Sequence, residues 1–378
     1  MKKRFWINFG GNLLMNIDEQ LEVLISYLET NKISYRENYS LKYETYFKMG
    51  GKVKCFIFPQ SCDKFKQAVI FLQNNHIKYK VIGFTSNIIL FDEIEYSVIL
   101  SPKNLTLLEI HDKVVEVEAG YSLQDFVRVV SILNNSEGYE GLEGIPASIG
   151  GAIVMNAGAY GCDISDNLIS VECIDKNNEI IILEKKDCHF RLRNSIFRSS
   201  GNYVILKAKF RLNNGNRNLI AKNIEKFHIA RHSYLDYVYP NLGSMMVGKD
   251  DVYKLIFSKK LFYSIIFWIL KYSFRNPVSK FILRKRPNRI VFNKLLLFYL
   301  KWEKNISLKY KLSPKGLNTL INDGNVSTQE IVNYIFLISS DLLENKLDIE
   351  NELVIEPSYK INPEFETTYN TIINRLNR

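Results

Sequence analysis

The stretch from residue 141 to residue 161, GLEGIPASIGGAIVMNAGAYG, is the part of the chain whose residue types point most directly to chemistry. It holds six glycines and four alanines but no lysine or arginine in 21 residues. Missing or minimal side chains let a flat or phosphorylated ligand touch the main chain. We therefore interpret this segment, the glycine cluster, as the wall of a site for a bulky cofactor. The alternative is that its glycines serve only close packing between strands.

A second glycine-bearing turn, GFTSN at residues 83–87, ends the predicted strand KYKVIGF (78–84). Gly83 can take a positive φ, and the side chains of Ser86 and Asn87 can join backbone N–H groups in holding a phosphate. Neither turn has the spacing GxGxxG or GxxxxGK[ST], so neither a Rossmann site nor a P-loop is indicated.

Three regions that must position these turns differ in their hydrophobic pattern. Residues 36–100 combine short apolar runs with one helical run, SCDKFKQAVIFLQNNH, that begins at Ser61, which predicts a small α/β unit. Residues 101–213 contain KVVEVEAG, ISVECID, EIIILE and YVILKAKFRL, which predict a second, mostly antiparallel sheet. Residues 214–378 are helix-rich, and residues 1–35 are an N-terminal extension.

The composition is that of a soluble globular protein with two or three domains, since 46% of the 378 residues are hydrophobic and 24% are charged. The five cysteines form no CxxC pair, so neither a zinc site nor a disulfide framework is indicated. The N-terminal MKKRFWINFGGNLLMNIDEQ lacks the apolar run of a signal peptide. We expect a cytoplasmic monomer with reduced thiols, no metal site and no nucleic-acid partner.

The positive charge of the chain is concentrated in residues 245–311. This segment holds 16 Lys/Arg and 3 Asp/Glu, a net charge of +13, whereas the whole chain carries +10. It also contains the apolar run LFYSIIFWIL (261–270), which is short of the roughly 20 residues that span a bilayer. The simpler interpretation is an inserted helical hairpin packed on its own protein. The alternative is weak peripheral association with anionic membrane through residues about 255–290.

These blocks together resemble the UDP-N-acetylenolpyruvoylglucosamine reductase (MurB) family. The glycine cluster is similar, nearly position for position, to the segment that marks this family. Other blocks follow in the family's order and extend the resemblance over most of residues 36–355. They are YETYFKMGG (43–51), VIGFTSNIIL (81–90), FRLRNSIFR (190–198), YPNLGSMM (239–246), LSPKGLNTLINDGNVSTQEI (312–331) and LDIENELVIEP (347–357).

The resemblance implies an α+β protein with an FAD-binding fold of the vanillyl-alcohol-oxidase (PCMH) type. Its two subdomains would be residues 36–100 and 101–213, followed by a C-terminal α+β substrate domain, 214–378. The implied reaction reduces the enolpyruvyl ether of a small-molecule UDP-sugar, UDP-N-acetylglucosamine enolpyruvate, to the lactyl ether of UDP-N-acetylmuramate. NADPH would give its hydride to FAD, and the reaction would serve peptidoglycan synthesis.

The resemblance also implies roles for individual residues. Arg193 matches the residue that stabilises the enolate, Ser244 the serine that protonates it, and Glu352, which aligns better than Glu350, the supporting carboxylate. The residues that would contact FAD are Gly50, Gly51, Gly83, Thr85, Ser86, Asn87, Ile88, Gly144, Ile145, Pro146, Ser148, Gly150, Gly151, Asn156, Gly158, Ala159 and Tyr160.

The chain departs from the family pattern mainly in the substrate half. Phe84 and Thr85 replace glycines of the phosphate turn, and Leu192 replaces a tyrosine. The run MVGKD replaces Phe-Lys-Asn-Pro after Ser244, so a substrate-contacting lysine is missing or moved to Lys249. Two alternatives therefore stay open: a paralogue that acts on another sugar in surface-polysaccharide synthesis, and a non-catalytic protein that binds FAD or a nucleotide-sugar.

Overall fold

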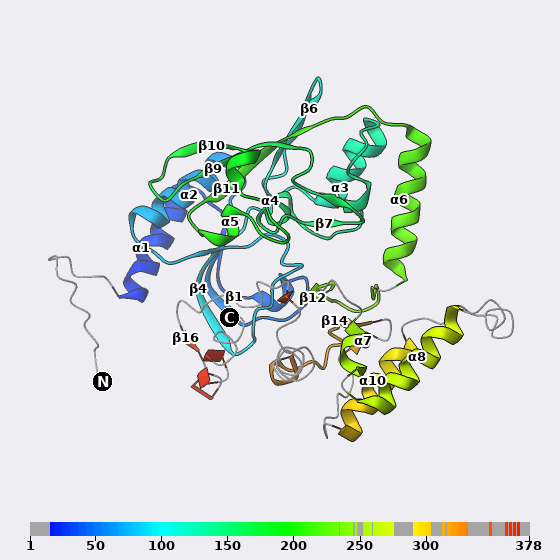
Figure 1. Cartoon of the computed structure of the whole chain (residues 1–378). Helices are drawn as coiled ribbons and strands as arrows, with labels where there is room; N and C mark the ends of the chain where they lie inside the picture. Colours follow the sequence, from blue (N-terminus) through cyan, green and yellow to red (C-terminus); the bar gives the residue numbers. More distant parts are fainter. Residues whose placement is uncertain are drawn as a thin grey trace.

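In its described part, the computed structural model has two five-stranded β-sheets, three two-stranded ones, and a helix-rich C-terminal part that lies to one side of the large sheets (Figure 1). The described residues are 16–233, 235–244, 246–247, 252–258, 260–275, 290–303, 312–313, 316–331, 348–349, 360–361, 363–364, 366–367 and 369–370.

The first sheet has the strand order β1-β2-β4-β16, and β3 also pairs with β4. Its strands are β1 (Tyr35–Ser40), β2 (Lys52–Ile57), β3 (Lys80–Val81), β4 (Ile94–Leu100) and β16 (Lys360–Ile361). Strands β2 and β3 run parallel to β4, whereas β1 and β16 are antiparallel to their neighbours. The C-terminal part of the chain thus returns to this sheet, which our boundary at residue 214 does not anticipate.

Two helices, α1 (Ile17–Thr30) and α2 (Cys62–Asn74), pack against the first sheet. Helix α1 begins with a capping box between Asn16 and Glu19. Helix α2 begins where the sequence predicts it, since the side chain of Ser61 accepts a hydrogen bond from the N–H of Lys64. The buried apolar side chains that the helices share with the sheet are Leu21, Leu24, Leu28, Cys55, Ile57, Phe65, Ala68, Val69, Leu72, Val98 and Leu100.

The second sheet has the order β10-β9-β11-β6-β5, and all its pairs are antiparallel, as the alternating pattern predicts. Its strands are β5 (Leu108–His111), β6 (Val114–Glu118), β9 (Leu168–Ile174), β10 (Ile180–Glu184) and β11 (Val204–Arg211). Ile174, Val204 and Leu206 from this sheet belong to the core of the first sheet, so a common apolar core joins the two sheets.

Short elements connect the strands of the second sheet: α3 (Leu123–Val127), α4 (Ile149–Val154), β7 (Gly158–Ala159), β8 (Cys162–Asp163) and α5 (Ile196–Ser199). The glycine cluster forms α4 and the β7–β8 hairpin. Tyr160 and Gly161, the two residues of the hairpin turn, have φ of 54° and 82°, as a type I′ turn requires.

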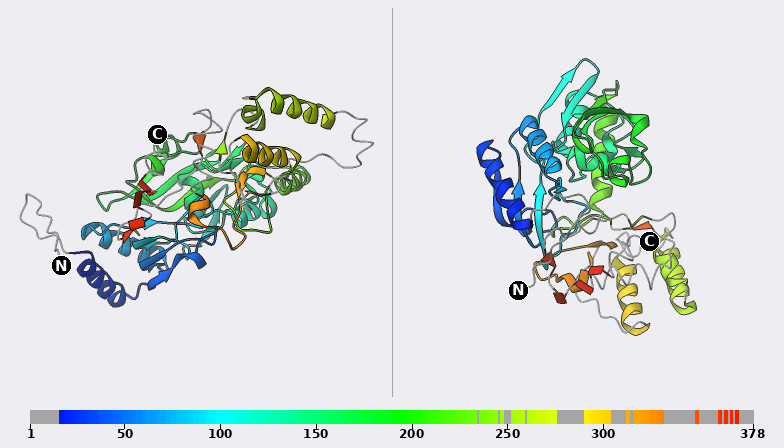
Figure 2. Two further views of the ribbon diagram at one scale, coloured as in Figure 1. Left: turned by 90° about the horizontal axis from the view of Figure 1, so that it is seen from below. Right: turned by 90° about the vertical axis from the view of Figure 1, so that its left-hand side faces the viewer.

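The C-terminal part contains α6 (Arg217–His232), β12 (Met246–Val247), α7 (Val252–Phe257), α8 (Leu261–Arg275), α10 (Ile290–Glu303), β13 (Leu312–Ser313), β14 (Gly316–Leu320) and β15 (Asp348–Ile349). Strand β12 pairs with β15, and β13 with β14. Helices α8 and α10 lie side by side at one edge of the molecule (Figure 2). Phe257 of α7, Tyr263 of α8 and Tyr299 of α10 share a core with Phe47 and Phe91 of the first sheet region.

The strand predicted at residues 78–84 is shorter in the structure, where only Lys80–Val81 is paired as β3. Ile82 still donates its N–H to the carbonyl of Leu100, but the chain then turns away from β4. The apolar pattern of this run reflects packing in the hydrophobic cores, where Ile82 is buried and Tyr79 and Val81 pack at the margin, rather than a longer strand.

Glu116 on β6 forms the centre of an ion-pair cluster with β11. Its carboxylate lies 2.6 Å from Nζ of Lys207 and 3.2 Å from Nζ of Lys209. Burial alone would raise the pKa of Glu116, but hydrogen bonds and charge from the two lysines outweigh burial and lower this pKa.

Glu116→Gln should therefore lower the free energy of unfolding at pH 7, by at most about 1 kcal/mol because water screens both pairs. A carboxyl with a depressed folded-state pKa stabilises above its unfolded pKa, and this contribution is lost as pH falls through the folded pKa. Urea unfolding at pH 7 and in acid measures the effect, with Glu179→Gln on the exposed surface as the control. An equal penalty at both pH values would contradict the ion-pair explanation.

Candidate active site

A large cavity is walled by four segments that are far apart in the sequence. Its volume is about 1430 Å³, more than the ~300–1,000 Å³ usual for a site that holds one small ligand. Most lining residues belong to four segments, within residues 72–88, 144–160, 193–205 and 231–244, and Tyr46 and Lys48 are among the single residues that add to the walls. The cavity therefore has room for a dinucleotide-sized group together with a second ligand.

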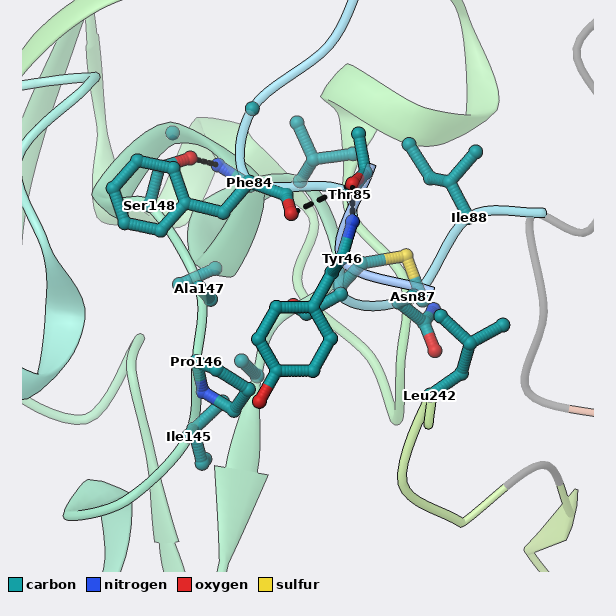
Figure 3. A pocket seen from close by; sticks show the side chains of 18 of the residues that line it. Tyr46, Phe84, Thr85, Asn87, Ile88, Ile145, Pro146, Ala147, Ser148 and Leu242 are labelled. Atoms are coloured by element: carbon teal, nitrogen blue, oxygen red, sulfur yellow. Dashed lines mark hydrogen bonds between the residues drawn. The ribbon is translucent and has the colours of Figure 1, made fainter. Parts of the chain in front are cut away.

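The two glycine-bearing turns touch one another in this cavity. A Cβ atom on Gly83 would lie 2.3 Å from Oγ of Ser148. The same Oγ accepts a hydrogen bond from the N–H of Gly151, 3.2 Å away, and so caps helix α4. Figure 3 shows the turn with Phe84 and Thr85 beside the segment Ile145–Ser148. Glycine at position 83 lets the first-sheet turn approach the start of α4.

Thr85 takes a left-handed conformation, with φ of 57°, that is costly for a β-branched residue. Its hydroxyl accepts a hydrogen bond from the N–H of Tyr46 at 2.7 Å and donates one to the carbonyl of Phe84 at 2.7 Å. The buried hydroxyl thus stabilises a turn in which the family resemblance leads one to expect glycines. The ring of Tyr46 lies beside this turn in the cavity (Figure 3).

Arg193 fastens its own segment to the end of the glycine cluster. Its guanidinium donates hydrogen bonds to the carbonyl of Asn156, at 3.2 Å, and to that of Gly158, and lies 3.9 Å from the carboxylate of Asp163. In return, Nδ2 of Asn156 donates to the carbonyl of Arg191 at 3.1 Å. Arg193 itself has φ of 51°, so its backbone is strained. These bonds fix the direction of the guanidinium at the cavity wall.

The β7–β8 hairpin explains why residue 158 is glycine, because a Cβ atom there would overlap Oδ1 of Asp163 and lie 2.8 Å from the backbone carbonyl oxygen of Cys162. Burial raises the pKa of Asp163, the charge of Asp166 raises it further, and Arg193 opposes the shift. Close packing in the β7–β8 hairpin thus requires glycine at position 158, and the same residue lines the cavity.

Ser244 lies on a loop that also lines the cavity, directly after Gly243, whose φ is 70°. The side chain of Asn241 shapes this loop, since Nδ2 donates to the carbonyls of Asp236 and Tyr239 and Oδ1 accepts from the N–H of Gly243. The structure therefore brings Arg193 and Ser244 to one cavity. Glu352 and the less well aligned Glu350 lie outside the described residues.

Most of the predicted cofactor residues line this cavity. They are Gly83, Thr85, Ser86, Asn87, Ile88, Gly144, Ile145, Pro146, Ser148, Gly150, Gly151, Gly158, Ala159 and Tyr160. Their contacts with a cofactor stay predictions, because shared lining establishes proximity and not binding.

Gly50, Gly51 and Asn156 are not among the residues that line it. Gly50 donates its N–H to Asp92, and a Cβ atom on Gly51 would lie 1.9 Å from the carbonyl oxygen of Ile94. The close approach of β2 to the chain before β4 accounts for glycine at position 51. Asn156 is 4% exposed, and its role in the structure is to hold the Arg193 segment.

Sequence reasoning missed Arg231, which lines the cavity from the last turn of α6. Its guanidinium stacks over the ring of Tyr160, 5.3 Å from the ring centre, and donates to the carbonyl of Gly141. Nε of Arg231 is buried, and no hydrogen-bond partner for it exists among the described residues. Gly144 makes room for this side chain, since a Cβ atom there would lie 3.1 Å from Nε. An arginine late in a polar helix carries no sequence signal of such a position.

A cation and a hydroxyl at the wall of one deep cavity can act on a substrate that develops negative charge and then takes up a proton. The cation would stabilise the charge, and the hydroxyl could deliver the proton. The small residues of the glycine cluster leave the main chain accessible to a large planar or phosphorylated group.

Comparison with known proteins shows which proteins this chain is similar to. A family model described as an FAD binding domain matches residues 53–184. The UDP-N-acetylenolpyruvoylglucosamine reductase of Fervidobacterium nodosum is 34% identical over 199 residues, which cover 53% of this chain and 64% of that relative. The protein of the same name from Clostridium novyi is 32% identical over 230 residues, which cover 61% of this chain and 73% of the relative.

The fold is also found in a solved structure, UDP-N-acetylenolpyruvylglucosamine reductase (MurB) from Thermus caldophilus. The superposition has a TM-score of 0.60 at 18% identity and covers 85% of this chain and 99% of that chain. The expected α+β fold with an FAD-binding domain is thereby confirmed. The chain belongs to the UDP-N-acetylenolpyruvoylglucosamine reductase (MurB) family of FAD-dependent oxidoreductases.

Proposed function

We propose that this protein reduces the enolpyruvyl ether of a UDP-sugar, UDP-N-acetylglucosamine enolpyruvate, to UDP-N-acetylmuramate with NADPH as the hydride donor. The observation that carries the proposal is the meeting of Arg193 and Ser244 in the cavity of a chain with an FAD-binding domain. The reaction would be a cytoplasmic step of cell-wall precursor synthesis.

The cavity walls fit FAD. Apart from the backbone of α4 and its chain neighbours, a Cβ atom on Gly151 would meet a single described atom within 4 Å, Oγ of Ser148 at 3.2 Å, so this wall is open on its cavity side. The turn at residues 85–88 and the segment 144–148 would hold the cofactor on either side of Gly83. When bound, FAD supplies two-electron chemistry, accepting a hydride from NADPH and passing it to the substrate double bond.

Arg193 would stabilise the negative charge that builds on the substrate carboxylate. Its bonds to the carbonyls of Asn156 and Gly158 orient the guanidinium before the reaction begins. A preoriented cation avoids the reorganisation that water would need, which is the main advantage of an enzyme site for such charge.

Ser244 would donate the proton that completes the reduction. Its loop is held by the side chain of Asn241 and by the backbone N–H of Asn322, which donates to the carbonyl of Pro240 at 2.9 Å. These hydrogen bonds fix the backbone of the loop that carries the Ser244 hydroxyl. Glu352 remains our proposal for the carboxylate that supports this step.

A second candidate, a paralogue for another sugar, is favoured by one observation. Leu192, which stands where the family resemblance leads one to expect a tyrosine, is 67% exposed beside Arg193. An apolar side chain there removes a hydroxyl that could contact the substrate. Turnover of a different UDP-sugar with the same cofactor would identify this candidate.

The assignment of the glycine cluster to FAD predicts opposite outcomes for two glycine substitutions. Gly151→Val should give folded protein that has lost most of its flavin, because the new side chain enters the cavity. Gly51→Ala should instead lower stability by about 1–3 kcal/mol, because the new methyl group meets a backbone carbonyl. Flavin absorbance per chain and the midpoint of thermal unfolding measure both. Stoichiometric flavin in Gly151→Val would remove this wall from the cofactor site.

The proton-donor role predicts that Ser244→Ala changes only one half-reaction. Flavin reduction by NADPH should stay nearly intact, whereas reoxidation by the enolpyruvyl substrate should slow by roughly 10² to 10⁴. Anaerobic stopped-flow absorbance separates the two steps, and Ser26→Ala, an exposed serine of α1, is the matched control. Equal slowing of both steps would mean that Ser244 only shapes the pocket.

Arg193→Lys tests whether orientation matters in addition to charge. Lysine keeps the positive charge but cannot hold the carbonyls of Asn156 and Gly158 at once. We expect a large loss in the second half-reaction with a smaller loss in flavin content. A variant with wild-type reoxidation would show that the two carbonyl contacts are dispensable.

A further inference from the structure

Residues 261–270 of helix α8 are apolar except for Ser264, yet only one side of the helix is covered. Tyr263 and Phe267 are buried in the core that α8 shares with α7 and α10. The opposite side exposes six large apolar side chains: Leu261, Phe262, Ile265, Trp268, Ile269 and Tyr272. Phe262 is 63% exposed and Tyr272 is 73% exposed. A contiguous exposed apolar surface of this kind is typical of an interaction site.

Helix α10 runs antiparallel to α8 and adds to the exposed apolar surface. Contacts join the start of α8 to the end of α10: Lys260 lies 3.1 Å from Glu303, and the rings of Tyr263 and Tyr299 are 4.8 Å apart. On α10, Leu297, Phe298 and Trp302 are exposed, and Trp302 reaches 69%. Both helices lie at the edge of the molecule, away from the second sheet (Figures 1 and 2). We call their exposed apolar residues the outer face.

The charge around the outer face is positive. Lys294 and Lys301 of α10 are exposed between its apolar residues, and Lys271 of α8 lies over the ring of Trp268. The segment 245–311 that contains both helices has a net charge of +13 from its sequence. A second copy of the chain would bring these like charges together, so a homodimer through this face is disfavoured.

Exposed tryptophan, tyrosine and phenylalanine between lysines are typical of a helix that lies in the interface of a membrane. The aromatic rings enter the headgroup region, and long lysine side chains reach outward to anionic headgroups. Within the described part of the chain, no helix is long and apolar enough to cross a membrane. The geometry therefore suits lying on a bilayer and not spanning one.

We propose that the outer face of α8 and α10 docks the protein on an anionic membrane surface. Tyr263 and Phe267 anchor the helices from the side opposite the exposed residues, so docking through the exposed side would leave the helices in place. The inference does not depend on the proposed reaction. Docking would keep the catalytic cavity, which lies between the sheets, outside the bilayer.

The sequence provides its own reporter for this proposal. Two of the three tryptophans, Trp268 and Trp302, belong to the outer face, and Trp6→Phe leaves them as the only fluorophores of their kind. Mixed phosphatidylglycerol and phosphatidylcholine vesicles should shift the emission of this variant to the blue at low salt and co-sediment with it. Vesicles of phosphatidylcholine alone should bind much more weakly, and added salt should release the protein.

Two sets of variants separate the apolar and the ionic contributions. Phe262→Ser combined with Trp268→Ser should lower the partition coefficient at least about tenfold. Lys294→Gln combined with Lys301→Gln should lower it about fivefold for each lysine removed. Leu107→Ser combined with Ile182→Ser, which changes similarly exposed residues just before β5 and on β10, should leave binding unchanged.

Circular dichroism and bound flavin check that each variant is folded. No blue shift and no co-sedimentation with anionic vesicles at low salt would overturn the proposal. It would also be overturned if sedimentation showed a dimer that Phe262→Ser with Trp268→Ser converts to a monomer, since the occupant would then be a second copy. Binding that the control pair weakens as much as the outer-face pair would likewise contradict it.

Discussion

The close approach of Gly83 to Ser148 is the constraint on which the site depends. One turn follows a strand of the first sheet, and the other begins α4 beneath the second sheet. A side chain at position 83 would push these turns apart and open the cavity between them. The apolar core around Ile174 and Leu206 holds the two sheets together, and so it also holds Gly83 close to Ser148. The hydrogen bonds of Arg193 then tie a third segment to the end of the same glycine cluster.

The sequence predicts the elements well where a local pattern decides them. Ser61 does start a helix, and the four long alternating runs of residues 101–213 do form antiparallel strands. The shortening of β3 and the return of β16 to the first sheet depend on contacts between distant residues, which no local pattern contains. Helix α8 packs Tyr263 and Phe267 against its own protein, as the hairpin interpretation expects, while Trp268 of the same apolar run stays exposed.

The sequence predicts which segments form the site, but not why particular residues occupy their positions in it. Small residues mark the cavity, but Gly51 and Gly158 are also glycines for reasons of close packing. Thr85 looks unfavourable in a phosphate turn, and only the structure shows its hydroxyl bonded to the N–H of Tyr46. Arg231 has no signal in the sequence, because its importance comes from the fold, which buries its guanidinium against Gly141 and Tyr160.

The central claim is that one cavity holds a flavin next to Arg193 and Ser244 and uses it on an enolpyruvyl sugar. The most direct test is the anaerobic absorption spectrum of the purified protein. It should show one flavin per chain, lose its colour with NADPH and regain it on addition of UDP-N-acetylglucosamine enolpyruvate. A flavin that NADPH reduces but the enolpyruvyl sugar leaves reduced would contradict the claim, and so would a protein that binds no flavin.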